Sequence, residues 1–108
     1  MAELHIKSLT CVNKQTGKQT KDRASLRVNG RTVSGPHIMG EGKSVTLNLR
    51  HPFTNKVAVT LVEQDGKSAD DDLGSVIIRD SLAGKGDKTG HFDAAPHAEY
   101  EITYNVRP

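Results

Sequence analysis

The sequence predicts an all-β protein, a single antiparallel β-sandwich of about eight short strands. Apolar and polar residues alternate with period two along most of the 108 residues, which is the pattern of half-buried strands. Gly, Pro and Asn-Gly turn signals recur at intervals of roughly eight to twelve residues, a spacing typical of sandwiches and barrels. No segment has a convincing helical period, and the chain length suits one domain over residues 1–108.

The first strand is expected over residues 4–11. Leu4 and Ile6 alternate on one phase, and Leu9 and Cys11 then alternate on the other. A shift of face inside a strand is what a β-bulge produces. Cys11 is the sole cysteine, so no intrachain disulfide can form, and we expect a small buried side chain there.

A polar stretch, "NKQTGKQTKD" (13–22), predicts a loop, and a hairpin follows it. The strand-like runs "ASLRV" (24–28) and "RTVSG" (31–35) flank the Asn29-Gly30 pair. Asn-Gly between two such runs is a strong hairpin signal because both residues tolerate positive φ. We expect the Gly35-Pro36 pair to end the second strand of this hairpin.

Two further strands are expected over residues 44–50 and 56–64, because each run carries apolar side chains at alternate positions. The apolar positions of each strand would face the core. We expect the His51-Pro52 pair to break the first of these strands.

Toward the C-terminus, we expect a strand over residues 74–80 and a glycine-rich loop over 81–91, "SLAGKGDKTGH". The last strand, "AEYEITYNV" (98–106), places four apolar or aromatic side chains on one face. These are Tyr100, Ile102, Tyr104 and Val106.

An acidic stretch follows the strand over 56–64. Five acids fall within ten residues: Glu63, Asp65, Asp70, Asp71 and Asp72. Like charges this close repel, so either a bound cation or hydration must compensate them. Ca²⁺ takes six to eight oxygen ligands, which carboxylates supply. Acids two residues apart project to the same side of a strand end, and a third acid can face them after a short loop. The alternative is that Asp is frequent here because it caps turns and stays hydrated, with no ion bound.

The stretch "LVEQDGKSADDDLGSVII" (61–78) resembles the third-loop signature of C2 domains, the calcium-dependent membrane-binding β-sandwiches. Its acids and its glycine fall in register with that signature without gaps; they are Glu63, Asp65, Asp71 and Gly74. The stretches "LHIKSLTC", "KDRASLRVNG" and "EYEITYNV" resemble further strands of the family. Asp22 matches the acid that closes the family's first loop. The whole chain is most similar to small stand-alone bacterial C2-like proteins.

The resemblance implies a C2-like sandwich that acts as a non-catalytic binding module. It implies that Ca²⁺ is held by Asp22, Glu63, Asp65 and Asp71, and that Gly74 marks the tight exit into the next strand. Asp70 and Asp72 are candidate additional ligands, and one of the two is expected to face solvent. The bound ion would recruit an anionic lipid surface or another polar ligand, such as a carbohydrate or a protein.

Two departures from the family weaken the implied site. Glu63 stands where the family usually has Asp. The family also carries an additional acid early in the first loop, whereas the first loop here, "NKQTGKQTK", has three Lys and no acid. The lost ligand and the added positive charge should weaken Ca²⁺ binding by Coulomb repulsion. The alternative function is therefore a metal-free scaffold for protein–protein interaction with a degenerate calcium site.

Other residue types that could carry chemistry give weaker patterns. His91, Asp93 and His97 have the residue types of a transition-metal site, but their spacing matches no structural zinc pattern, so ordinary loop histidines are the preferred interpretation. No G-x-S-x-G motif surrounds a serine, and Cys11 lies inside an expected strand, where a nucleophile is poorly placed. We therefore expect no enzyme activity.

Charge is unevenly distributed along the chain. Residues 1–50 hold nine Lys/Arg against three Asp/Glu, and residues 63–80 hold six acids against two basic residues. Basic residues of this kind usually form a solvated surface, and the few aromatics argue against nucleic-acid binding.

No apolar run is long enough for a transmembrane segment. The N-terminus lacks the features of a secretory signal, so we expect a cytoplasmic protein or export by another route. The oligomeric state stays open.

Overall fold

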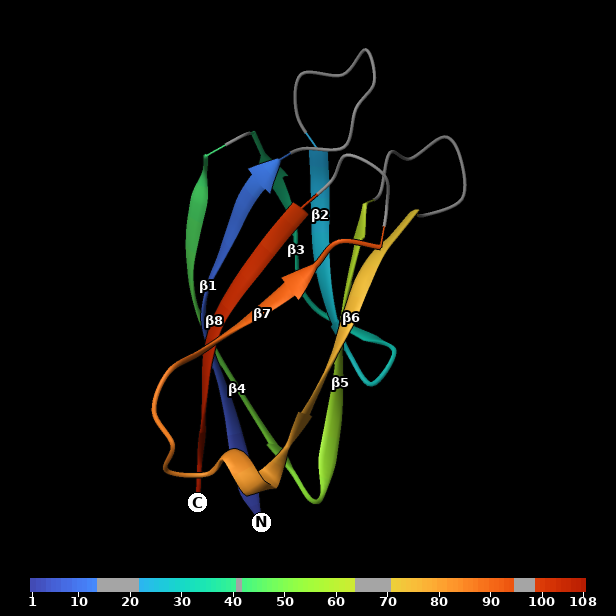
Figure 1. Ribbon diagram of the computed structural model, residues 1–108. Helices are drawn as coiled ribbons and strands as arrows, with labels where there is room; N and C mark the ends of the chain where they lie inside the picture. Colours follow the sequence, from blue (N-terminus) through green and yellow to red (C-terminus); the bar gives the residue numbers. More distant parts are fainter. Residues whose placement is uncertain (14–21, 41, 64–70, 95–98) are drawn as a thin grey trace.

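In a computed structural model, the chain folds into two four-stranded antiparallel sheets that form a sandwich (Figure 1). The structure describes residues 1–13, 22–40, 42–63, 71–94 and 99–108. The expected all-β sandwich of eight strands is confirmed. The strands are β1 (Ala2–Asn13), β2 (Asp22–Val28), β3 (Arg31–Met39), β4 (Ser44–Phe53), β5 (Lys56–Glu63), β6 (Asp71–Arg79), β7 (Lys88–Phe92) and β8 (Glu99–Arg107), and a 3₁₀-helix η1 spans Asp80–Leu82.

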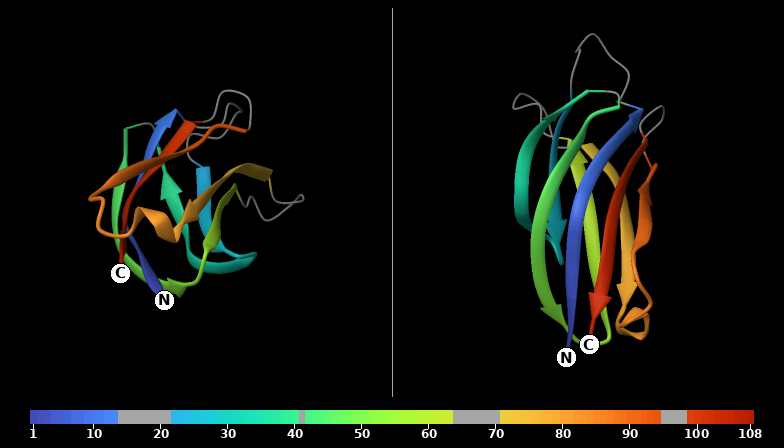
Figure 2. Two further views of the ribbon diagram at one scale, coloured as in Figure 1. Left: turned by 60° about the horizontal axis from the view of Figure 1, so that its bottom comes forward. Right: turned by 90° about the vertical axis from the view of Figure 1, so that its left-hand side faces the viewer.

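One sheet has the strand order β4-β1-β8-β7 and the other has the order β3-β2-β5-β6. The right-hand view of Figure 2 shows β4, β1, β8 and β7 side by side in front of the second layer. The two chain termini lie at one end of the sandwich. The opposite end, here called the distal end, holds the start of β2 at Asp22, the end of β5 at Glu63 and the start of β6 at Asp71 (Figure 1).

The core lies between the two sheets and is built from alternate residues of the strands. On β5, Val57, Val59 and Leu61 are at most 1% exposed. On β8, the predicted buried face is confirmed, because Tyr100 and Ile102 are fully buried and Tyr104 and Val106 nearly so. Burying one such side chain stabilises the fold by about 1.5–3 kcal/mol, so the alternating pattern accounts for much of the driving force.

The bulge predicted in the first strand is confirmed. The register of β1 shifts between Ile6 and Ser8 against both β4 and β8. One extra residue is therefore accommodated, and Ile6 and Leu9 both face the core, with exposures of 1% and 0%. Cys11 is buried, as expected.

The predicted Asn-Gly hairpin is also confirmed. Asn29 and Gly30 have positive φ values of 50° and 85° and join β2 to β3. The Oδ1 atom of Asn29 accepts a hydrogen bond from the backbone N–H of Ala58 at 3.1 Å, so the turn is also tied to β5.

Two expected strand ends are wrong, and both involve proline. Strand β3 continues past Gly35-Pro36 to Met39, and β4 continues past His51-Pro52 to Phe53. Both strands lie at sheet edges. An edge strand has one side without a pairing partner, so a proline there removes no ladder hydrogen bond.

Strand β7 is a further correction, because it lies inside the glycine-rich segment expected to be a loop. Its sequence, "KTGHF", has no alternating apolar pattern. Gly90 is buried, and a Cβ atom there would lie 3.2 Å from side-chain atoms of both Val76 and Ile102. Pairing with β8 and the close packing of this small residue therefore accompany the strand, and a local pattern does not reveal it. Strand β6 also begins three residues earlier than expected, at Asp71 instead of residue 74.

Candidate functional site

The distal end brings three of the four predicted calcium ligands onto neighbouring strands. Glu63, the last residue of β5, pairs with Asp71 on β6 and with Ala24 on β2. Asp22 begins β2 two residues from Ala24. The backbone positions of Asp22, Glu63 and Asp71 therefore gather at one end of the β3-β2-β5-β6 sheet, and Asp65 lies outside the described residues.

The side chain of Glu63 is buried at this end, with 5% exposure. It continues the inward face of β5, which carries Leu61 two residues earlier. Its Oε2 atom accepts a hydrogen bond from the backbone N–H of Arg23 at 3.3 Å. A carboxylate withdrawn from water is strongly unfavourable unless hydrogen bonds or cations compensate it. The buried carboxylate of Glu63 therefore needs such compensation at the distal end.

Gly74 lies inside β6, not at an exit into the strand. The register between β5 and β6 shifts at this point, because Leu61 pairs with Gly74 and Val62 with Asp72. Gly74 has a φ of 133°, and a Cβ atom there would lie 3.0 Å from the Cα atom of Phe92. The glycine therefore allows a bulge of β6 to approach the end of β7.

Asp72 takes part in this bulge. Its Oδ1 atom accepts the backbone N–H of Gly74 at 2.9 Å, and its side chain is exposed. This contact gives Asp72 a local structural role of the kind that Asp commonly has in turns. Asp70, the other candidate additional ligand of the predicted calcium site, lies outside the described residues.

A second cluster lies on the outer face of the β4-β1-β8-β7 sheet, where β7 pairs with β8. His91 is directly opposite Glu101, and Glu99 is two residues along β8. The nearest ligand atoms of the three side chains all lie within 4.8 Å of one another. The sequence pattern had joined His91 to Asp93 and His97 instead. The two glutamates were missed because β7 was not recognised as a strand, and His97 lies outside the described residues.

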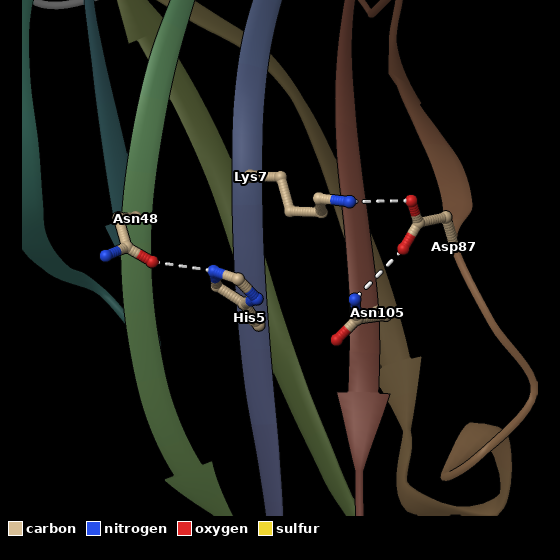
Figure 3. Close-up of polar contacts among 5 residues, drawn as sticks. All are labelled: His5, Lys7, Asn48, Asp87 and Asn105. Atoms are coloured by element: carbon tan, nitrogen blue, oxygen red, sulfur yellow. Dashed lines mark hydrogen bonds and ion pairs between the residues drawn. The ribbon is translucent and has the colours of Figure 1, made fainter.

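Two separate groups of polar contacts lie on the same outer face, a His5–Asn48 pair and a network around Asp87 (Figure 3). The ring Nε2 of His5 donates to Asn48 Oδ1 at 2.8 Å. The Lys7 ammonium donates to Asp87 Oδ2 at 2.8 Å, and the Asn105 amide donates to Asp87 Oδ1 at 2.9 Å. These two donors, Lys7 first and Asn105 next, lower the pKa of Asp87 below its usual value of 3.8. The network ties the segment before β7 to β1 and β8.

Comparison with known proteins supports the fold through structure and not through sequence. No protein-family model matches the chain, and no curated protein sequence matches it. The solved structure of the C2A and C2B domains of extended synaptotagmin 2 aligns with 98% of this chain, with a TM-score of 0.58 and 15% identity. This chain spans only 39% of that structure.

Two further solved structures give similar results. The calcium-bound form of the same C2A and C2B domains aligns with 97% of this chain and 44% of its own, with a TM-score of 0.55 and 18% identity. A structure described as a C2 domain aligns with 99% of this chain and 97% of its own, with a TM-score of 0.56 and 8% identity.

Within the described residues, no helix is both long and apolar enough to cross a bilayer. The strand order, the alternating core and the structural matches agree with the resemblance found in the sequence. The chain therefore has a C2-like β-sandwich fold.

Proposed function

We propose that the protein is a non-catalytic, calcium-dependent binding module. In this proposal Asp22, Glu63, Asp65 and Asp71 hold Ca²⁺ at the distal end, and the loaded site recruits an anionic lipid surface. The observation that carries the proposal is the carboxylate of Glu63, which is 5% exposed at the point where β2, β5 and β6 meet.

The donor set fits a hard cation. All four side chains offer carboxylate oxygens, which Ca²⁺ prefers over nitrogen or sulfur. The backbone pairing of Glu63 with Asp71, and the start of β2 at Asp22, bring acids from separate connections to one end of the sheet. Four carboxylates that bind through one oxygen each leave part of a coordination number of six to eight open. Bound Ca²⁺ would supply positive charge at these open positions, where a phosphate or carboxylate oxygen of a ligand can bind.

Two further facts support the proposal, the first for the ion and the second for a lipid surface as the partner. One structure with this fold is described as calcium-bound. The first loop of this chain contributes Lys14, Lys18 and Lys21, and each basic residue near an anionic membrane contributes about 1 kcal/mol of attraction.

Thermal melting of chelator-treated protein, with and without Ca²⁺, tests the metal. A ligand that binds only the folded state stabilises it by about 2.7 kcal/mol at a hundredfold excess over its Kd, so Ca²⁺ should raise the melting temperature. The double variant Asp65→Asn, Asp71→Asn should lose this response. Asp72→Asn is the matched control: it removes a neighbouring charge and keeps an oxygen that accepts the Gly74 N–H, so its response to Ca²⁺ should persist.

Sedimentation with vesicles tests the partner. We expect the protein to sediment with phosphatidylserine vesicles in Ca²⁺ and to remain in the supernatant with chelator or with phosphatidylcholine vesicles.

In the melting experiment, an unchanged melting temperature at millimolar Ca²⁺ would exclude the calcium proposal, because even weak extracellular sites bind in that range.

The alternative, a metal-free scaffold with a degenerate calcium site, is favoured by one specific contact. The backbone N–H of Arg23 already donates to Glu63 Oε2, which compensates part of the buried charge without an ion. In this case Asp65→Asn, Asp71→Asn should stabilise the protein in chelator and in Ca²⁺ alike, because it removes repulsion and no ligand.

A further inference from the structure

We propose that His91, Glu99 and Glu101 form a separate site for a first-row transition-metal dication such as Zn²⁺. The site lies on the outer face of the β4-β1-β8-β7 sheet and differs from the proposed calcium site in its strands and its donor atoms. It does not depend on calcium binding at the distal end.

The pairing of β8 with β7 at Glu101 and with β1 at Glu99 positions the three side chains. His91 and Glu101 are directly opposed across the two antiparallel strands, where side chains on one face are neighbours. Glu99 and Glu101 share that face because side chains alternate along a strand. The backbone of the cluster is therefore held by sheet hydrogen bonds, which orients ligands better than a loop does.

The spacing of the ligand atoms suits a small metal ion. The Nδ1 atom of His91 lies 3.6 Å from Oε1 of Glu101. Tetrahedral Zn²⁺, with bonds of about 2.0–2.2 Å, holds its ligand atoms roughly 3.4 Å apart. The first pair already has this spacing, and the three ligand atoms all lie within 4.8 Å of one another. Side-chain adjustments that bring all three ligand atoms from within 4.8 Å to this spacing would complete the set.

The exposure of the cluster indicates an open site. The side chains of His91 and Glu101 are 54% and 35% exposed, so they can adjust around an ion and water can reach it. Three protein ligands with a fourth position open to water are the arrangement of open zinc sites. The imidazole nitrogen selects a transition metal over Ca²⁺, which takes oxygen ligands.

The charges in this part of the sheet also favour a dication. Glu99 and Glu101 carry like charges on one face, and their partners across β1 are the uncharged residues Asn13 and Thr10. An ion pair between protonated His91 and Glu101 would be exposed and worth at most about 1 kcal/mol. A dication bound to both glutamates compensates both charges and joins the edge strand β7 to β8.

Calorimetric titration of the chelator-treated full chain with Zn²⁺ tests the site. We expect one equivalent to bind. His91→Ala should weaken binding at least about tenfold, since even outer-shell partners of metal ligands contribute 10- to 100-fold. Glu101→Gln and Glu99→Gln should each weaken it as well. Because all three side chains are partly exposed, the variants should fold, which far-UV circular dichroism checks.

Two controls separate this site from the rest of the protein. His37→Ala removes a histidine on β3 of the other sheet and should leave Zn²⁺ affinity unchanged. The double variant Asp65→Asn, Asp71→Asn removes two of the proposed calcium ligands and should also retain Zn²⁺ binding. Bound Co²⁺ should give the intense visible absorption of a low-coordinate site with a nitrogen ligand, and His91→Ala should abolish it.

Three results would overturn the proposal. The first is full Zn²⁺ affinity in His91→Ala. The second is an equal loss in His37→Ala, which would indicate adventitious binding to surface histidines. The third is a loss of Zn²⁺ binding in the Asp65→Asn, Asp71→Asn double variant or in His97→Ala, with Zn²⁺ binding retained in His91→Ala. The ion would then bind elsewhere.

Discussion

The acids of the distal end and the cluster of His91, Glu99 and Glu101 use similar side chains in opposite settings. Glu63 is 5% exposed and faces inward where strands end. His91 and Glu101 face outward within the β7–β8 ladder and are 54% and 35% exposed. A buried carboxylate must be compensated within the folded protein, whereas an exposed one is compensated by water. The same type of side chain therefore contributes differently to the stability of the fold in the two regions.

Gly74 connects the two regions, because its bulge on β6 lies against Phe92, next to His91. Any side chain at Gly74 would push β6 and β7 apart. Perturbing this contact should affect both regions at once, whereas Glu63→Gln and Glu101→Gln each act on one region.

The largest effect is expected for Gly74→Ala. The variant combines a φ of 133° with a Cβ atom only 3.0 Å from backbone, so we expect a loss of about 2–3 kcal/mol in the free energy of unfolding. Urea denaturation measures it. Gly84→Ala is the control, since Gly84 also has a positive φ but no atom within 4 Å of the position that a Cβ would occupy; it should lose only about 1–2 kcal/mol. Equal losses would show that the contact with β7 is unimportant.

The next effect concerns Glu63→Gln measured with Ca²⁺. The amide oxygen can still accept the Arg23 N–H, so without Ca²⁺ the change in stability should stay within about 1 kcal/mol. The stabilisation by Ca²⁺, about 2.7 kcal/mol at a hundredfold excess over Kd, should be largely lost. Glu101→Gln is the matched substitution in the outer cluster and should retain the full calcium response in the same melts. A normal response in Glu63→Gln would remove Glu63 from the site.

A smaller effect is expected for Glu101→Gln in metal-free buffer. Because the pair with His91 is exposed, the free energy of unfolding should change by no more than about 0.5 kcal/mol. Urea titration at neutral pH measures this change. A loss comparable to that of Gly74→Ala would mean that the outer cluster supports the fold far more than its exposure indicates.

The smallest effect is expected for Asp87→Asn, which acts on the network of Figure 3. Lys7 and Asn105 lower the pKa of Asp87 below 3.8. A carboxyl group whose pKa is lower in the folded state contributes stability above its unfolded pKa, and the contribution disappears as pH falls through the folded pKa. The wild type should therefore melt slightly higher than the variant at pH 7, and this difference should shrink below about pH 4. A constant difference across the acid range would contradict the assignment.

The sequence sufficed for the fold class and for most of the strands because their information is local. Alternation at Val57, Val59 and Leu61 reports one buried face, and Asn29-Gly30 reports a turn that needs positive φ. The acids of the distal end were also recognised from local spacing. Whether their side chains bind an ion stays a prediction.

Three features depended on the assembled sandwich: the strand boundaries at the two prolines, the existence of β7, and the pairing of His91 with Glu101. Proline is tolerated in β3 and β4 because both are edge strands, a fact that no local pattern contains. β7 is paired with β8 along its length, and its small Gly90 fits against Val76 and Ile102. An alternating pattern in the sequence indicates which side chains face the core. Packing between distant segments determines which strands are neighbours, and that packing brings His91, Glu99 and Glu101 together.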